Sequence, residues 1–262
     1  MRQVVKKRLF LILFCVGFAG VLSILLIDLS ALAALIPAAA DAPPITPAIK
    51  VLSLIQPAGL VALAVLIGIV LAPKVGLSAP AAESFAAGDR VMPALKPQLI
   101  PAVLGGVIGS LAIVLTHAVF KPLLTTETLA RITRFGSLLP LPMRLLYGGL
   151  TEEVLIRWGV MTLLVWIAWR LFQKRLAKPT SVCFVAVILI SSIVFGLGHL
   201  PIAFVVLPQI TIAVVFFVII ANSAFGFVAG FLYWKRGLES AMIAHLLCHI
   251  VLAIASRAGA YF

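Results

Sequence analysis

Two segments of the sequence place ionisable side chains among residues that are otherwise almost all apolar. TEEVLIRWGV carries Glu152, Glu153 and Arg157, and SAMIAHLLCHIVL carries His245 and His249. A carboxyl group in a water-poor cavity can act as a general base, and imidazoles beside it can hold a water molecule or stabilise an oxyanion. These residue types therefore predict that the protein activates a water molecule for hydrolysis.

The spacing within the first segment predicts different roles for its two glutamates. Glu153 and Arg157 are four residues apart, so on an α-helix they lie on one face and can pair. Glu152 lies about 100° further round the helix and points elsewhere. We predict a structural pair of Glu153 and Arg157, with Glu152 as the free carboxylate. A buried ion-pair cluster of all three side chains is the alternative.

A third apolar segment, IVFGLGHLP, adds Phe195 and His199, one helical turn apart. His245 and His249 are also one turn apart and share a helix face. At about 1.5 Å per residue, Glu152 and His249 reach the same level of a bilayer core of about 30 Å, while His199 lies nearer the outer surface. One glutamate and three histidines are also a donor set that Zn²⁺ accepts. The residues alone therefore leave open whether the glutamate or a metal activates the water.

The composition predicts that these segments lie in a membrane. Apolar residues make up 63% of the 262 residues, charged residues make up 11%, and the mean hydropathy is +1.24. Soluble domains are closer to half apolar and about a quarter charged. Seven apolar runs are long enough, or nearly so, to cross a bilayer as helices: about 9–35, 51–72, 99–120, 145–169, 180–199, 209–234 and 238–255.

We therefore expect an all-α, polytopic bundle of about seven transmembrane helices. The count becomes eight if the segment 201–234 holds two short helices that are broken near Asn222 and Ser223. Nearly all intramembrane ionisable residues lie in the last four spans. Residues 1–139 are accordingly predicted to form N-terminal transmembrane helices and loops, and residues 140–256 a four-helix catalytic core.

Proline and polar residues predict the connections between the spans. The proline-containing segments 36–50 and 73–98 are expected to be loops. The segment 123–139 mixes Thr, Glu and Arg with Leu and Ile, which indicates an amphipathic helix along the membrane interface.

The net charge of +12 predicts the orientation of the protein and not a nucleic-acid partner. With seven spans, most Lys and Arg residues fall on the side of the N-terminus, where the positive-inside rule places the cytoplasm. The compact size and short loops are typical of bacterial proteins. We expect an integral protein of a bacterial cytoplasmic membrane, whose partners are the lipid bilayer and a membrane-associated protein or peptide substrate.

At these residues the chain resembles the CPBP family, also called the Abi or CAAX prenyl protease 2-like family. The family pattern is E-E-x-x-x-R, F-x-x-x-H and H-x-x-x-N or a variant, on three separate membrane helices. Here, in the same order, the pattern reads Glu152-Glu153-VLI-Arg157, Phe195-GLG-His199 and His245-LLC-His249. The resemblance covers about residues 140–256.

The resemblance implies an intramembrane endopeptidase. We favour the glutamate chemistry, which requires no cofactor, and Zn²⁺ is the alternative. According to this resemblance, Glu152 is the general base and His199 is its partner in activating water. His245 and the residue one turn later support the oxyanion. That residue, His249, departs from the family pattern, because the best-studied members have Asn there. A neutral imidazole can still donate one hydrogen bond, and a third imidazole favours Zn²⁺ more than the Asn form does.

We predict an intramembrane endopeptidase that hydrolyses a peptide bond of a membrane-associated substrate with a Glu- and His-activated water. Two other classes of protein fit the same sequence. One is a non-proteolytic membrane scaffold or binding protein of the same fold. The other is a proton-coupled transporter, because buried Glu and His can relay protons. The transporter is disfavoured because no inverted repeat and no pair of broken helices is evident.

Overall fold

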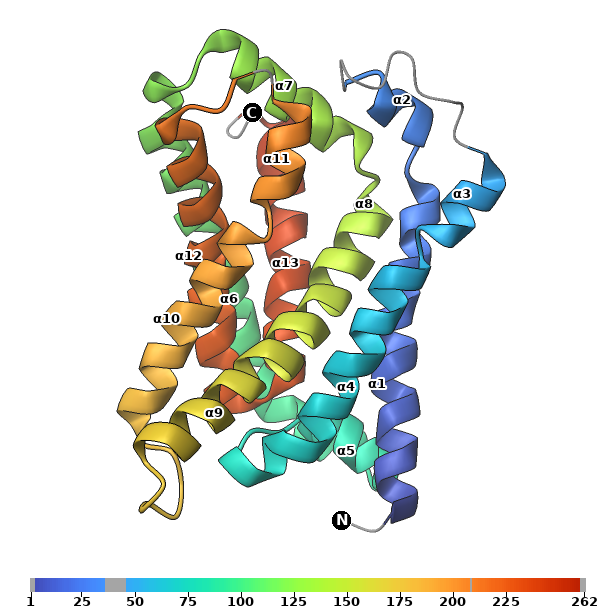
Figure 1. The fold of residues 1–262 in the computed structure, drawn as a ribbon, viewed down its shortest axis with the longest axis vertical. Coiled ribbons are helices and arrows are strands. Elements are labelled where there is room, and N and C mark those ends of the chain that lie inside the picture. The colour runs from blue at the N-terminus through green and yellow to red at the C-terminus, as the bar shows by residue number, and fades with distance from the viewer. Residues whose placement is uncertain (1–2, 36–45, 208, 260–262) are drawn as a thin grey trace.

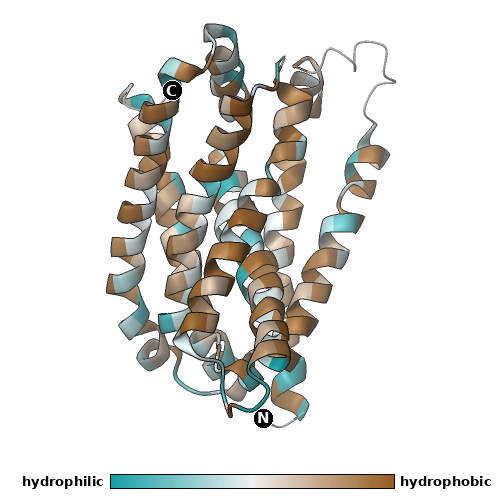
Figure 2. Cartoon of the chain, turned by 60° about the vertical axis from the view of Figure 1, so that its left-hand side comes forward, coloured by the Kyte–Doolittle hydropathy of each residue, from teal (hydrophilic) through white to brown (hydrophobic). Residues whose placement is uncertain are grey.

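The computed structural model describes residues 3–35, 46–207 and 209–259, and within them the protein is a helical bundle without strands (Figure 1). Within these described ranges, seven helical segments are long and apolar enough to cross a membrane: Gln3–Leu26, Pro47–Val75, Val91–Leu123, Leu141–Phe172, Ser181–Val206, Ile212–Arg236 and Leu238–Arg257. Apolar residues run along these segments, and hydrophilic residues gather mostly at the two ends of the bundle (Figure 2). The predicted all-α, polytopic fold is confirmed.

The first three spans and their connections are helical over most of their length. They comprise α1 (Gln3–Ser23), η1 (Ile24–Leu26), α2 (Leu29–Ala33), α3 (Pro47–Leu52), α4 (Ile55–Val75), α5 (Pro80–Ala87) and α6 (Val91–Phe120). The prediction of loops at 36–50 and 73–98 is therefore wrong for the greater part of the described residues, and residues 36–45 lie outside them. Pro47 and Pro80 begin helices, where a missing N–H costs no intrahelical hydrogen bond.

The C-terminal part begins with a short connection and ends with the last helix of the bundle. Its elements are η3 (Lys121–Leu123), α7 (Thr126–Leu138), α8 (Leu141–Met143), η4 (Arg144–Thr151), η5 (Val154–Met161), α9 (Thr162–Phe172), α10 (Ser181–Leu197), α11 (Leu200–Val206), α12 (Ile212–Arg236) and α13 (Leu238–Arg257). The segments η4 and η5 are π-helical. Together α8, η4, η5 and α9 form one span.

The alternative of a break near Asn222 and Ser223 is ruled out, because α12 runs unbroken through both residues. The side-chain amide of Asn222 donates a hydrogen bond to the carbonyl of Val218 at 2.8 Å, so its polar group is satisfied within the helix. The interruption lies earlier, between the end of α11 at Val206 and the start of α12 at Ile212. The short α11 completes the span of α10, which keeps the count at seven.

The predicted amphipathic helix is α7, which lies across the end of the bundle opposite the N-terminus (Figure 1). Its residues Leu129, Ile132 and Phe135 pack on a buried cluster that includes Val206 of α11 and Phe217 of α12. The apolar face of α7 is therefore covered by protein, and its exposed residues include Glu127 and Arg134.

The third span belongs spatially with the C-terminal helices, since α6 packs along both α12 and α13. The Cα of Gly106 in α6 approaches Ala244 of α13 so closely that a side chain there would meet the Ala244 carbonyl at 2.9 Å. Small residues at such contacts let membrane helices pack through their backbones. The division of the chain at residue 139 stays a prediction. In space, α6 packs against helices of the predicted C-terminal core.

The N-terminal end of α13 is fixed to α5 and α6 by a set of hydrogen bonds. The carboxylate of Glu239 accepts from the backbone N–H of Ala82 at 2.9 Å and from the side-chain amide of Gln98 at 3.2 Å. The same Gln98 accepts from the backbone N–H of Ser240 at 2.9 Å. These bonds set the position of α13 along its axis, and so the depth of the histidines that it carries.

Candidate functional site

Glu152 and Glu153 lie where the two π-helical segments η4 and η5 meet. Single π-turns within helices occur frequently at functional sites. A threonine hydroxyl lies at the end of each segment. Thr151, the last residue of η4, donates to the carbonyl of Gly17 on α1 at 2.6 Å. Thr162, the first residue after η5, donates to the carbonyl of Arg157, five residues back, at 3.1 Å. The regular α-helix assumed from the sequence is therefore widened on both sides of the two glutamates.

The carboxylate of Glu153 is fully buried and faces two basic side chains. Its Oε2 lies 3.2 Å from Nε of Arg157, and its Oε1 lies 2.8 Å from Nδ1 of His245 on α13. The contact with Arg157 has the distance of a salt bridge without the alignment of a hydrogen bond. The i, i+4 spacing predicted the Arg157 contact, and the contact with His245 was not predicted.

Arg157 is held by contacts from two further helices. Its Nη2 donates a hydrogen bond to the carbonyl of Gly226 on α12 at 3.2 Å. Its guanidinium carbon lies 5.0 Å from the centre of the Phe195 ring on α10, within the range of a cation–π interaction. A buried charge is costly unless it is paired, and here Glu153, a carbonyl and an aromatic face surround it.

The imidazoles of His245 and His249 are stacked on α13, with ring centres 4.8 Å apart and planes 15° from parallel. Phe225 of α12 covers the His245 ring at 4.2 Å. Because an ionised carboxylate only accepts hydrogen bonds, the Nδ1 of His245 is the donor to Glu153. In the neutral ring, Nε2 of His245 then carries the lone pair.

His249 differs from His245 in having no hydrogen-bond partner for either ring nitrogen among the described residues, although both nitrogens are buried. Its Nε2 packs against the Cα of Gly148 in η4, where any larger side chain would collide with it. A buried polar group without a partner is unusual in folded proteins and often marks a ligand or catalytic position. His249 is therefore available to hydrogen-bond a bound molecule.

His199 lies at the junction of α10 and α11 and is half-buried. Its Nδ1 lies 2.9 Å from the carbonyl of Phe195, so Nδ1 carries the proton and donates it. In the neutral ring, Nε2 has a free lone pair that can accept a hydrogen bond from water. The ring also meets that of Phe195 edge-on at 4.8 Å.

Phe195 connects the three motifs, since its ring contacts Arg157, His199 and His245 at 5.0, 4.8 and 6.2 Å. The structure thus brings together residues from η5, α10 and α13. Glu152 is half-buried and, within the described part of the chain, forms no hydrogen bond or salt bridge. It is the less buried of the two glutamates, and Glu153 is the one bonded to His245.

The positions of the donor side chains decide whether these residues could hold a metal ion. Among the described residues, no group of three or more His, Cys, Asp or Glu side chains is positioned to hold a metal ion. The Nδ1 atoms of His199 and His245 are occupied by Phe195 and Glu153, which leaves Nε2 of each ring as its possible donor atom. In the described residues, the side chains of Glu152, His199, His245 and His249 do not converge as a Zn²⁺ site requires.

The sequence analysis missed two contributors to the site. Phe225 lies in an apolar stretch, and nothing in its spacing connects it with His245, twenty residues later. Gly148 is part of a Gly-Gly pair, which is a recognisable signal for close helix packing, although it does not identify His249 as the neighbour.

Residues 134–251 match the protein-family model described as type II CAAX prenyl endopeptidase Rce1-like. The matched range contains all three motifs, from Glu152 to His249, which confirms the family resemblance. Comparison with curated proteins and with solved structures gives no match.

Proposed function

Because residues 134–251 belong to the Rce1-like family of type II CAAX prenyl endopeptidases, we propose that the protein hydrolyses a peptide bond of a membrane-associated substrate within the bilayer. One observation carries the proposal. Residues of the three family motifs, from three separate spans, meet around the ring of Phe195. A pattern spread over a hundred residues is thus gathered at one place, as a shared catalytic task requires.

Glu152 is the proposed general base. It is half-buried and has no described hydrogen-bond partner, so its carboxylate is free to take a proton from water. The water oxygen then bonds to the carbonyl carbon of the substrate, and the carbonyl electrons form an oxyanion. When the C–N bond breaks, Glu152 returns the proton to the leaving amine. His199 positions the water through the lone pair of its Nε2.

His249 is the proposed principal donor to the oxyanion, because its buried ring nitrogens have no other described partner. His245 is the second proposed donor to the oxyanion, in its doubly protonated form. Its Nδ1 already donates to Glu153, so its Nε2 can donate to the oxyanion only when Nε2 also carries a proton. Glu153 and Arg157 then act as positioning residues, which hold the His245 ring in a fixed orientation. No metal is required in this mechanism.

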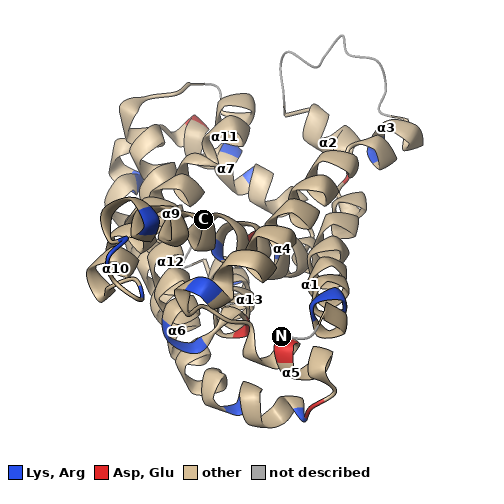
Figure 3. Cartoon of the chain, turned by 60° about the horizontal axis from the view of Figure 1, so that its bottom comes forward, with Lys and Arg blue, Asp and Glu red and all other residues tan. Residues whose placement is uncertain are grey.

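The proposed orientation places the N-terminal end of the bundle in the cytoplasm of a bacterial cell. Lys and Arg residues are visible around this end in Figure 3, on α1, α6 and the chain between α9 and α10. Positive residues favour the cytoplasmic side of a membrane. The name of the family refers to prenylated CAAX substrates, and we propose the broader class of membrane-associated peptides for this chain.

The proposal is tested by comparing the membrane proteomes of cells that carry the wild type, Glu152→Gln or Glu127→Gln. Glu127 is an exposed glutamate on α7 and serves as the matched control. An uncleaved precursor is expected to accumulate only with Glu152→Gln. Continued cleavage by that variant would refute Glu152 as the base. An unchanged phenotype, with partner binding retained, would favour a scaffold of the same fold.

A further inference from the structure

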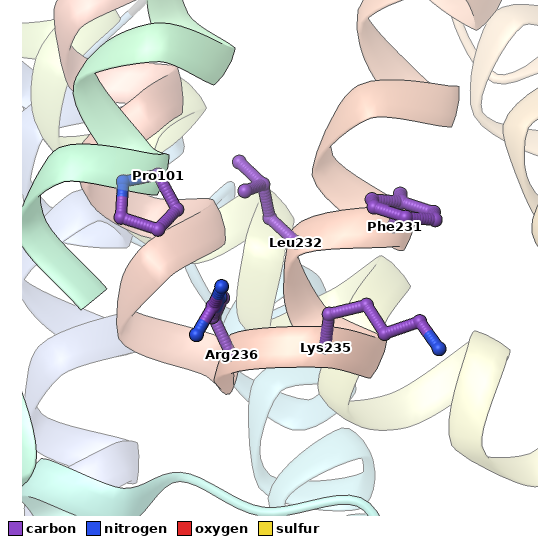
Figure 4. Close-up of a pocket in the computed structure, with 5 residues that line it drawn as sticks. All are labelled: Pro101, Phe231, Leu232, Lys235 and Arg236. Atoms are coloured by element: carbon purple, nitrogen blue, oxygen red, sulfur yellow. The ribbon is translucent and has the colours of Figure 1, made fainter. Parts of the chain in front are cut away.

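An open pocket of about 490 Å³ lies on the surface between α6 and the C-terminal end of α12 (Figure 4). Its lining is Pro101 from α6 and Phe231, Leu232, Lys235 and Arg236 from α12. The pocket contains none of the residues proposed for catalysis. The proposed catalytic function therefore does not account for this pocket.

The lining changes from apolar to cationic along the axis of α12. Phe231 precedes Lys235 by four residues, and Leu232 precedes Arg236 by four, so each cation lies one turn below an apolar side chain. One turn is about 5.4 Å, and Arg236 is the last residue of the span. A molecule that fits must place its anionic group at the membrane boundary and its apolar part in the hydrocarbon.

The two cations have no acidic partner within the described residues. The Nζ of Lys235 lies 3.4 Å from the centre of the neighbouring Trp234 ring. Glu239 follows closely in sequence, but its carboxylate accepts hydrogen bonds from Ala82 and Gln98. Both Lys235 and Arg236 are exposed, so they are available to an anion from outside the protein.

We propose that this pocket binds an anionic phospholipid of the surrounding leaflet. The phosphate lies between Lys235 and Arg236, and an acyl chain lies along Phe231 and Pro101. A lipid fits better than a soluble anion, because the upper lining is apolar and faces the hydrocarbon. Trp234 beside the pocket is typical of the membrane–water boundary, where phospholipid phosphates are found.

Lipid binding has a structural consequence at the contact between α6 and α12. Gly105 of α6 lies against the side chain of Leu232, which also lines the pocket. A lipid that touches both helices is bound only when they are together, so it stabilises the packed state. Anionic lipid is therefore expected to raise the thermal unfolding temperature of the protein.

The test uses native mass spectrometry of the purified full chain with dioleoyl phosphatidylglycerol or dioleoyl phosphatidylcholine. The pocket variant is Lys235→Gln/Arg236→Gln. The matched control is Lys174→Gln/Arg175→Gln, which removes the same charge from exposed positions after α9. We expect the wild type and the control to retain phosphatidylglycerol preferentially. The pocket variant should bind it about twenty-five-fold more weakly, since each of the two cations near an anionic surface contributes roughly five-fold.

Two further variants separate the charge from the apolar lining. Exchanging the cations by Lys235→Arg/Arg236→Lys should preserve binding, and Phe231→Ser should weaken it without changing the charge. Equal retention of the two lipids by the wild type, or equal loss in the pocket and control variants, would overturn the proposal. Displacement of phosphatidylglycerol by millimolar inorganic phosphate would also overturn it, because the site would then recognise a free anion.

Discussion

The carboxylate of Glu153 lies 2.8 Å from Nδ1 of His245. The two residues are 92 positions apart in the chain, and their contact joins two different spans. The same carboxylate faces Arg157 at 3.2 Å. The buried carboxylate of Glu153 thus contacts a cation in its own span and an imidazole in another span. A histidine whose second nitrogen is held by a carboxylate has a fixed ring orientation, which links the ion pair directly to the proposed site.

Replacing Glu153 by Gln is expected to destabilise the protein severely. The substitution keeps the shape but leaves the buried guanidinium of Arg157 without its counter-charge. Removing one partner of a buried pair costs about 3–5 kcal/mol. Thermal unfolding in detergent should show a large drop for Glu153→Gln and a partial recovery for Glu153→Gln/Arg157→Met. The exposed Glu127→Gln should be near neutral. Equal unfolding temperatures for the single and double variants would contradict this account.

Replacing Gly148 by Ala is expected to lower activity by displacing the His249 ring, because the added methyl group would collide with Nε2. Gly59→Ala is the control, since a methyl group there meets nothing within 4 Å. Both substitutions add the same methyl group within a span. Substrate cleavage should fall only for Gly148→Ala. The double variant Gly148→Ala/His249→Asn should recover part of the lost activity, because Asn is smaller than His. Equal activity of the two glycine variants would show that the ring position is unimportant.

The local features of this protein were predictable from its sequence. The seven spans follow from runs of apolar residues, and the contact of Glu153 with Arg157 follows from a spacing of four residues. The helix α7 follows from the mixture of Thr, Glu and Arg with Leu and Ile in one segment. Each of these predictions depends on neighbours along the chain, where helical geometry determines which side chains meet.

The features that depend on contacts between helices were not predictable in the same way. Nothing along the chain indicates that His245 meets Glu153, or that Phe225 covers His245. The π-helical turns also escaped prediction, because their hydroxyl and carbonyl contacts depend on neighbouring helices, as the bond from Thr151 to Gly17 illustrates. The spacing of residues along the sequence predicts which side chains share a helix face. Which faces contact each other depends on how the helices pack.

Replacing His249 by Asn is expected to retain most of the activity, while His249→Ala should lose it. An Asn side chain can still donate a hydrogen bond to an oxyanion, and an Ala side chain cannot. Removing one oxyanion donor typically lowers the turnover rate by about 10²- to 10³-fold. Cleavage rates of the purified variants, with their unfolding temperatures as a control for folding, provide the measurement. Full activity of His249→Ala would remove His249 from the mechanism.

Chelation is expected to leave the activity of the purified protein unchanged. In the described residues, no three His, Cys, Asp or Glu side chains converge as a metal site requires. Elemental analysis should accordingly find zinc well below one equivalent per chain, with or without the histidines. Near-stoichiometric zinc that is lost in both His199→Ala and His245→Ala, together with inhibition by a strong chelator, would instead establish a metal-activated water.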